Sequence, residues 1–407
     1  MIKSFIARVA PCFRRVPSGG VFIAEIDGLR FIAISAVLLV HIIAYSLTYR
    51  TVFVAGPADQ WLRYHYEGLA RGVELFFVIS GFVIAAPFVH HYRLHAPAVD
   101  VGQFYQRRLT RLEPPFLLAM LVTYAALVLV HDVRAQPLLP HLLATCIYSH
   151  GIIYNSKSTI AFITWSLEIE IQFYLLAPLI LRMLSFQTMI RRSSLLAFAG
   201  LSLLLDRWLA ASPSLSRVTF FHYLPLFIAG IAVCDAALPN GCWRSVRCFA
   251  WDAIGFVALA SAFFVPVIWT AWLLPFLFGL AVICGFRGVL LSRSLSHRWV
   301  TTIGGMCYSI YLVHEPLICF FGKLTSRVAM SHSISVNAST QAVLLVLPVL
   351  FCSALFFVII EKPCMNKHWP RRLVEVVTTR LWNGNECLKS VPAQGSGIMS
   401  EIDSSSA

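Results

Sequence analysis

Charge is scarce in this sequence. Asp, Glu, Lys and Arg together make up 13% of the 407 residues, about half of what a soluble domain of this size carries. So few charges cannot cover a water-facing surface, which excludes the two or three soluble domains that the length alone would suggest. Hydrophobic residues reach 58%, and the mean hydropathy is +0.75. The composition therefore indicates a polytopic membrane protein, which we expect to be all-α with about ten transmembrane helices.

Several motifs of soluble enzymes are also missing. The eleven cysteines are scattered without a C-x-x-C pair, which argues against a disulfide framework or a zinc site, and we expect no metal. The sequence has no G-x-S-x-G elbow, no Walker loop and no H-E-x-x-H. His95 and Asp100 have the H-x4-D spacing of soluble glycerolipid acyltransferases, but this short loop cannot supply the α/β domain that such a dyad needs. No internal repeat supports an inverted-repeat transporter.

Apolar stretches long enough to cross a hydrocarbon layer of about 30 Å occupy most of the chain. We predict a basic N-terminal segment, 1–24, with no long apolar core, a membrane domain over 25–365, and a partly disordered tail over 366–407. The loop 132–162 is expected to hold a short interfacial helix around 138–148. The ten predicted spans are 29–49, 68–89, 114–131, 163–184, 194–210, 219–238, 249–267, 269–291, 301–322 and 340–361.

Basic residues are distributed unevenly between the two sides of these spans. With both termini in the cytoplasm, 23 of the 32 Lys and Arg residues fall on the inner side, as the positive-inside rule requires. The bias accounts for the net charge of +13 without a nucleic-acid partner. We therefore expect an integral membrane protein with both termini in the cytoplasm.

The first span carries two polar residues that are costly in a membrane, Arg30 and His41. Eleven residues place them on one helix face, about 16 Å apart along the axis. Arg30 alone could be an interfacial anchor, and His41 alone could form a hydrogen bond between two helices. Together they indicate a functional face.

Other spans bring polar groups to a similar depth. Glu170 lies seven to eight residues inside the fourth span, and His314 lies at the same level in the ninth. Arg71 and Glu74, three residues apart at the start of the second span, could be a neutralising pair. A shared polar layer suits a buried reaction chamber, although a proton or ion pathway would need one too.

A pair of arginines precedes the third span. Arg108 and Arg111 are three residues apart and so adjacent on a helical turn, which suits binding of phosphate oxygens. Ordinary positive-inside charge would explain the same residues.

Six stretches resemble acyltransferase family 3, whose members are integral-membrane enzymes that acylate sugars. The chain departs from the family pattern at Glu74, where Asp is more usual, and at Cys307, which replaces Ser. The W-S-L-x-x-E-x-x-F-Y stretch assigns the family glutamate to Glu170 and not to Glu168. The matching stretches occur in the family order and are Glu25–His41, Arg71–Phe82, the R-x-x-R of Arg108 and Arg111 followed by Pro114, Trp165–Tyr174, Gly305–His314 and Glu361–Pro363.

The resemblance implies transfer of an acyl group, acetyl in the first instance, from cytoplasmic acyl-CoA to a hydroxyl of a carbohydrate or glycolipid. Acyl-CoA is a co-substrate, and no bound cofactor is expected. About 40 residues follow the last span, so we expect a stand-alone membrane domain without the esterase-like domain that some members carry. The implied catalytic residues are His41 and Glu170, the CoA-binding residues are Arg30, Arg108 and Arg111, and the supporting residues are Arg71, Glu74, Ser80, Trp165, Ser166, Tyr308 and His314.

In this reading His41 is the general base for the acceptor hydroxyl, and Glu170 orients or charge-stabilises its imidazole. A covalent acyl-histidine stays open. Two alternatives also remain: a proton-coupled transporter or flippase of a glycan or lipid intermediate, and a membrane-bound O-acyltransferase acting on lipid or protein. The sequence does not define the acceptor, the acyl chain length or the oligomeric state.

Overall fold

The computed structural model shows most of the chain as helices and short connections. The chain divides into two compact units, residues 1–365 and 366–407. In the second unit the structure describes Asn366 and Trp369, whose N–H donates to the Asn366 carbonyl at 3.0 Å. The predicted segment 1–24 and tail 366–407 thus lie almost wholly outside the described residues. These residues are 22–49, 56–130, 135–210, 220–238, 247–266, 269–325, 328, 333–366 and 369.

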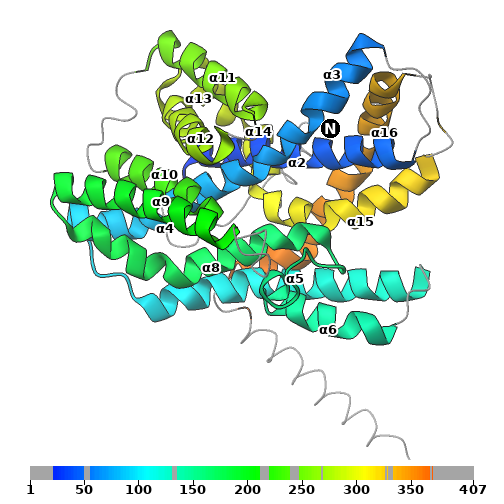
Figure 1. The fold of residues 1–407 in the computed structure, drawn as a ribbon, viewed down its shortest axis with the longest axis horizontal. Coiled ribbons are helices and arrows are strands. Elements are labelled where there is room, and N and C mark those ends of the chain that lie inside the picture. Colours follow the sequence, from blue (N-terminus) through cyan, green and yellow to red (C-terminus); the bar gives the residue numbers. More distant parts are fainter. Residues whose placement is uncertain are drawn as a thin grey trace, which may run out of the picture. The chain divides into compact units, whose positions relative to one another are not determined.

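The N-terminal half of the first unit begins with long apolar helices (Figure 1). The second helix, α3, is short and polar, and Pro57 opens it at a position where the missing N–H of proline costs nothing. Helix α4 ends where His95 takes a φ of 55°, the left-handed conformation that stops a helix. The elements are α2 (Ala24–Tyr49), α3 (Pro57–His65), the 3-10 segment η2 (Tyr66–Arg71), α4 (Gly72–Leu94) and α5 (Val101–Val130).

The middle of the chain alternates short and long helices. Helix α6 corresponds to the short helix expected around 138–148. The elements are α6 (Ala135–Cys146), α7 (His150–Tyr154), η3 (Phe162–Thr164), α8 (Trp165–Ile180), η4 (Leu181–Ser185), α9 (Thr188–Ala210) and α10 (Phe220–Ala237).

The C-terminal part contains a helix pair with a sharp break. Helices α14 and α15 are bent by 68° relative to each other at Met306. Ser309, in the first turn of α15, is buried. The elements are α11 (Phe249–Phe264), α12 (Thr270–Arg287), α13 (Leu290–Leu295), α14 (Arg298–Gly305), α15 (Cys307–Thr325), α16 (Ile334–Phe356), the π-helical turn η7 (Phe357–Glu361) and α17 (Lys362–Cys364).

Helix α2 is central to the first unit, because it packs against α4, α14, α15 and α16. Helices α4 and α10 approach closely at two glycines. A Cβ on Gly81 would lie 2.1 Å from the Phe227 carbonyl oxygen, and one on Gly230 would lie 2.0 Å from that of Val78. The backbones therefore touch where any larger residue would push the helices apart.

The ten predicted spans all overlap helices, but the number of membrane crossings is not confirmed. Within the described residues, six helices are long and apolar enough to cross a membrane, or seven if α14 and α15 form one bent span. Helix α11 and residues 272–287 of α12 are apolar but shorter. The prediction and the structure therefore differ in how many helices are long enough to cross a membrane, and not in where the helices lie along the chain.

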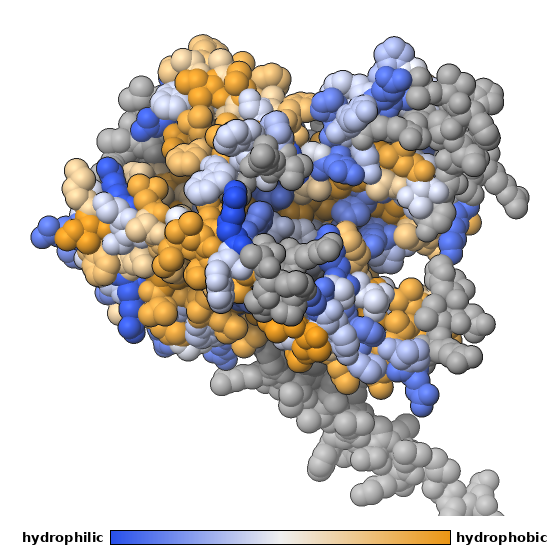
Figure 2. All heavy atoms as spheres, viewed as in Figure 1, coloured by the Kyte–Doolittle hydropathy of each residue, from blue (hydrophilic) through white to orange (hydrophobic). Residues whose placement is uncertain are grey.

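Large apolar side chains are exposed on several of these helices, and Figure 2 shows hydrophobic residues across much of the visible face. Water would penalise such an area, whereas lipid would not. No strand occurs in the described part of the chain. The protein is an all-α, integral, polytopic membrane protein. Examples of exposed apolar residues are Leu121 and Val122 on α5, Leu175 and Leu179 on α8, Leu196 and Leu204 on α9, and Val343 and Leu347 on α16.

Candidate active site

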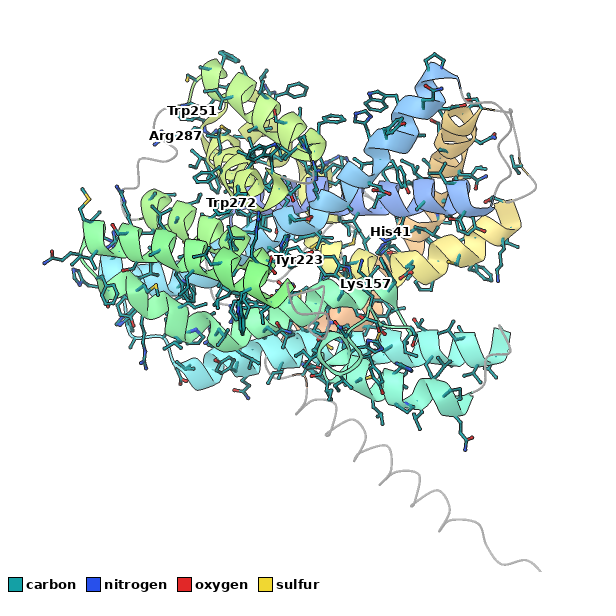
Figure 3. All side chains as sticks on the ribbon, viewed as in Figure 1. His41, Lys157, Tyr223, Trp251, Trp272 and Arg287 are labelled. Carbon is teal, nitrogen blue, oxygen red and sulfur yellow. The ribbon has the colours of Figure 1, made fainter. Side chains whose placement is uncertain are left out.

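His41 lies on α2, and its ring is held by its own helix (Figure 3). Its Nδ1 atom is 2.7 Å from the carbonyl oxygen of Val37, one turn earlier. A carbonyl oxygen only accepts hydrogen bonds, so in the neutral ring Nδ1 carries the proton and Nε2 keeps its lone pair. Helix α2 therefore fixes the tautomer of His41 and leaves Nε2 available to accept a proton.

His314, on α15, lies directly against His41. The ring centroids are 4.9 Å apart with the planes at 74°, an edge-to-face contact. Nδ1 of His314 is 2.7 Å from the carbonyl oxygen of Tyr311, so this ring has the same tautomer. Its Nε2 is buried and has no hydrogen-bond partner among the described residues. The structure thus brings together two of the predicted site residues, each with Nε2 unprotonated.

Glu170, on α8, has partners other than His41. Its Oε1 accepts a hydrogen bond from Ser80 Oγ at 2.5 Å and another from the hydroxyl of Tyr174. Tyr174 is four residues further along α8 and so lies on the same face. The direct contact that we expected between Glu170 and His41 is not made; both hydroxyl groups instead bind Oε1 of the carboxylate.

A small cavity lies beside Glu170, between α5, α8 and α15. Its volume is about 10 Å³, which is room for one water molecule, so a longer ligand must displace side chains to enter. Within the described residues, no three His, Cys, Asp or Glu side chains gather so as to hold a metal ion. The cavity is lined by Leu112, Tyr148, Leu167, Glu170, Ile171, Tyr174 and Tyr308.

Arg108, on α5, lies between two aromatic rings. Its guanidinium carbon is 3.7 Å from the ring centroid of Phe104 and 5.5 Å from that of Tyr174. One of its N–H groups donates to the Phe104 carbonyl at 3.1 Å, and no carboxylate forms an ion pair with it in the described part of the chain. Because a guanidinium has five N–H donors, most of them remain for a ligand.

Arg111, one turn further along α5, is bound differently. Its Nη2 is 3.6 Å from Oε1 of Glu361, a buried carboxylate at the end of η7. The other oxygen of Glu361 accepts the N–H and hydroxyl of Ser309, at 3.1 and 2.5 Å, at the start of α15. The two arginines that we expected to form one phosphate-binding fork therefore have separate partners.

Arg30 and Arg71 are also engaged within the protein. Arg30 Nη1 is 2.5 Å from Asp27 Oδ1 in the first turn of α2. Arg71 donates to two carbonyl oxygens at the C-terminal end of α11, that of Ala262 at 2.9 Å and that of Val265. Carbonyl groups at a helix end have no hydrogen-bond partner within the helix. The Arg71–Glu74 ion pair that the spacing allows is not formed, because the carbonyls at the end of α11 bind the guanidinium.

The remaining supporting residues join neighbouring helices. Ser166 Oγ and the Tyr311 hydroxyl are 2.6 Å apart and connect α8 to α15. Tyr308 donates from its hydroxyl to the Leu112 carbonyl at 2.8 Å and connects α15 to α5. The ring of Trp165, which lies at the start of α8, contacts other aromatic rings. These contacts hold the helices that carry His314, Glu170 and the arginines.

Two residues that sequence reasoning did not single out belong to the site. Tyr174 joins Glu170 to Arg108, and its place four residues after Glu170 is the signal that could have indicated it. The charge of Lys157 acts on the His41 imidazole, and the two labelled residues lie near each other in the view of Figure 3. Lys157 lies in a loop, and nothing in the sequence pattern connects that loop to His41.

The family model described as "Acyltransferase domain" matches residues 23–360. The chain belongs to this acyltransferase family. It is 26% identical over 342 residues to the O-acetyltransferase OatA of Staphylococcus aureus (strain NCTC 8325 / PS 47), covering 74% of this chain and 51% of the relative.

A putative O-acetyltransferase of Staphylococcus aureus (strain COL), SACOL0978, is also 26% identical, over 329 residues, with the same coverage of 74% and 51%. The chain thus spans about half the length of the curated relatives it matches. No solved structure matches it.

Proposed function

We propose that the protein is an O-acyltransferase that moves an acyl group, acetyl in the first instance, from acyl-CoA to a hydroxyl of a carbohydrate or glycolipid. The observation that carries the proposal is the state of His41. Its Nδ1 proton is committed to the Val37 carbonyl, so Nε2 keeps the lone pair that a general base needs. Membership of the acyltransferase family and the similarity to O-acetyltransferases support the reaction class.

In the proposed reaction, His41 Nε2 takes the proton of the acceptor hydroxyl as its oxygen attacks the thioester carbonyl carbon. The carbon–sulfur bond then breaks, and the CoA sulfur takes the proton from Nε2, so the histidine returns to its starting state. The edge contact with His314 holds the imidazole in position. The products are the acylated acceptor and free CoA.

We assign the donor phosphates to Arg108, because its guanidinium is packed between rings and keeps most of its donors unused. Arg30 is tied to Asp27, and Arg111 is tied to Glu361, so we give them supporting roles. Glu170 then acts through Tyr174, whose ring flanks Arg108. This revises the expectation that Glu170 orients His41.

We further propose that the end of the site that carries Arg108 and Arg111 faces the cytoplasm. Both termini then lie on that side of a bacterial inner membrane. The distribution of Lys and Arg along the sequence supports this orientation. It also gives the donor access, because the charged nucleotide of acyl-CoA stays in water while the pantetheine arm reaches inward.

The test uses the purified protein in lipid vesicles with acetyl-CoA labelled in the acetyl group and a total glycan and glycolipid extract. We expect label on the glycan as an alkali-labile ester, and none with His41→Ala. A proton-coupled transporter or flippase would move material without labelling it, and that result would overturn the proposal. Label trapped on the protein in the absence of acceptor, and lost with His41→Ala, would favour an acyl-histidine over direct transfer.

A further inference from the structure

Lys157 is an exposed cation in the connection between α7 and α8. Its ammonium nitrogen is 4.1 Å from the ring centroid of Phe162 and 5.3 Å from that of Trp165, which gives cation–π contacts with both rings. Desolvation lowers the pKa of Lys157 from its ordinary value. No carboxylate in the described part of the chain forms an ion pair with it. Its charge is therefore positioned by the protein but not neutralised.

The segment around Lys157 is fixed on both sides. Before it, His150 Nδ1 lies 3.0 Å from the Ser156 carbonyl oxygen and donates to it. After it, the Ser158 hydroxyl lies 2.7 Å from that of Thr145 on α6. Two hydrogen bonds thus hold a loop whose one ionisable residue, from 155 to 161, is Lys157. Such ties reduce the entropy lost when the ammonium binds a partner.

The position of Lys157 relative to His41 raises a chemical problem. A positive charge close to an imidazole opposes its protonation, yet a general base must become protonated during the reaction. An anion that pairs with Lys157 would cancel this effect at the moment the acceptor is bound. The donor phosphates are assigned to Arg108, which leaves the acceptor as the source of that anion.

We propose that Lys157 selects an acidic acceptor, by pairing its ammonium with a carboxylate or phosphate close to the hydroxyl that reaches His41. The inference rests on the proposed acyl transfer and defines the class of its acceptor. Phe162 is 45% exposed, and its ring offers an apolar surface to the sugar beside the charge. The acceptor site thus lies on the α7–α8 connection, and the donor site lies at α5.

The first test reads the charge of the product and needs no variant. Wild-type protein in vesicles receives acetyl-labelled acetyl-CoA and a total glycan and glycolipid extract, and the labelled glycan is passed over an anion-exchange column. We expect the label to be retained. Label in the flow-through would overturn the inference while leaving acyl transfer intact, whereas no label on any glycan would mean that the proposed function itself fails.

Two pretreatments of the extract distinguish the sources of the anion. Amidation of carboxylates with a carbodiimide should abolish labelling if the acceptor carries a carboxylate. Phosphatase should abolish it if the acceptor carries a phosphate monoester. Retained label that resists both treatments indicates a phosphodiester or diphosphate, which is still an anion and supports the proposal.

The second test uses matched lysine variants and the retained acceptor fraction. Lys157→Gln should raise the apparent KM for that fraction roughly ten- to a hundredfold, the size of a lost charge-assisted hydrogen bond, with kcat nearly unchanged. Lys157→Arg should restore most of the affinity, and Lys323→Gln, an exposed lysine on α15, should have no effect. A fall in kcat at unchanged KM would place Lys157 in the chemical step and overturn the assignment.

Discussion

The two ends of the candidate site are held by different kinds of contact. At the histidine end, His41 and His314 each bond through Nδ1 to a carbonyl of the preceding turn of their own helix. At the arginine end, Glu361 joins Ser309, which is 52 positions away in the sequence, to Arg111 on α5. One end is therefore prepared by local helix geometry, and the other by contacts between distant segments.

This difference predicts which substitutions affect the reaction and which affect the stability of the fold. A side chain that bonds only to its own helix can be removed without disturbing other helices, so its loss should affect the reaction. A carboxylate that joins two elements supports the fold, so its loss should affect the free energy of unfolding. Arg108 and Glu170 have contacts of both kinds. The following substitutions distinguish an effect on the reaction from an effect on the free energy of unfolding.

The largest effect is expected at His41. His41→Ala removes the proton acceptor and should lower kcat roughly 10²- to 10⁴-fold, with the melting temperature nearly unchanged. Labelled-acetate transfer per folded molecule, measured beside a thermal melt, gives both quantities. His297→Ala, on an exposed residue before α14, is the control. A His41→Ala enzyme that kept more than a few per cent of wild-type turnover would show that His41 is not the base.

The second effect is structural. Glu361→Ala leaves the Arg111 guanidinium without its buried partner, and breaking a buried pair in this way costs about 3–5 kcal/mol of stability. The variant should therefore melt at lower temperature, while turnover per folded molecule stays close to that of the wild type. Glu67→Ala, at an exposed residue in η2, should leave the melt unchanged. A fully stable Glu361→Ala protein would contradict the structural role.

Most of the fold could be predicted because helix formation in lipid leaves few choices. Apolar runs must form helices that satisfy their own backbone groups, so each of the ten predicted stretches overlaps at least one helix. Which of these helices cross the membrane is harder to predict from the sequence. Helix α8 has 16 residues, and the ninth stretch contains the 68° bend at Met306, which no hydropathy average reveals.

The contacts of the site that form within one helix could be predicted from the sequence, whereas those between distant segments could not. Spacing alone puts Tyr174 on the face of Glu170 and puts Val37 one turn before His41. Spacing could not show that Arg71 bonds to Ala262, which is 191 residues away, because that contact depends on how η2 and α11 pack. The same limit hid the connection between Lys157 and His41.

The third substitution compares the two arginines of α5. Arg108→Ala should raise the KM for acetyl-CoA by roughly 10- to 100-fold, since a charge-assisted hydrogen bond contributes about 1.5–3 kcal/mol, and acetyl-pantetheine, which lacks the nucleotide, should be unaffected. Arg111→Ala should instead lower the melting temperature, because it leaves Glu361 buried without its ion-pair partner. Steady-state kinetics with both donors and thermal melts measure these effects. If both variants changed only KM, the two arginines would form the single fork that their spacing suggested.

The smallest effect is expected at Glu170, and it decides which end of the site this carboxylate serves. Glu170→Gln keeps an oxygen that can accept from Ser80 and Tyr174 but loses the charge, so the Tyr174 ring beside Arg108 is held less firmly. We expect the KM for acetyl-CoA to rise about two- to tenfold, the net value of one hydrogen bond, with kcat little changed.

Glu168→Gln is the matched control, because two positions place Glu168 about 200° away around α8. Its carboxylate accepts the N–H groups of Gly151 and Ile152, at 3.0 and 3.3 Å, so the change should not alter the KM for acetyl-CoA. If Glu170→Gln instead lowered kcat tenfold or more at unchanged KM, the carboxylate would act on the imidazolium of His41. Glu170 would then contact His41 during the reaction through a movement of α8 relative to α2, and it would belong to the histidine end of the site.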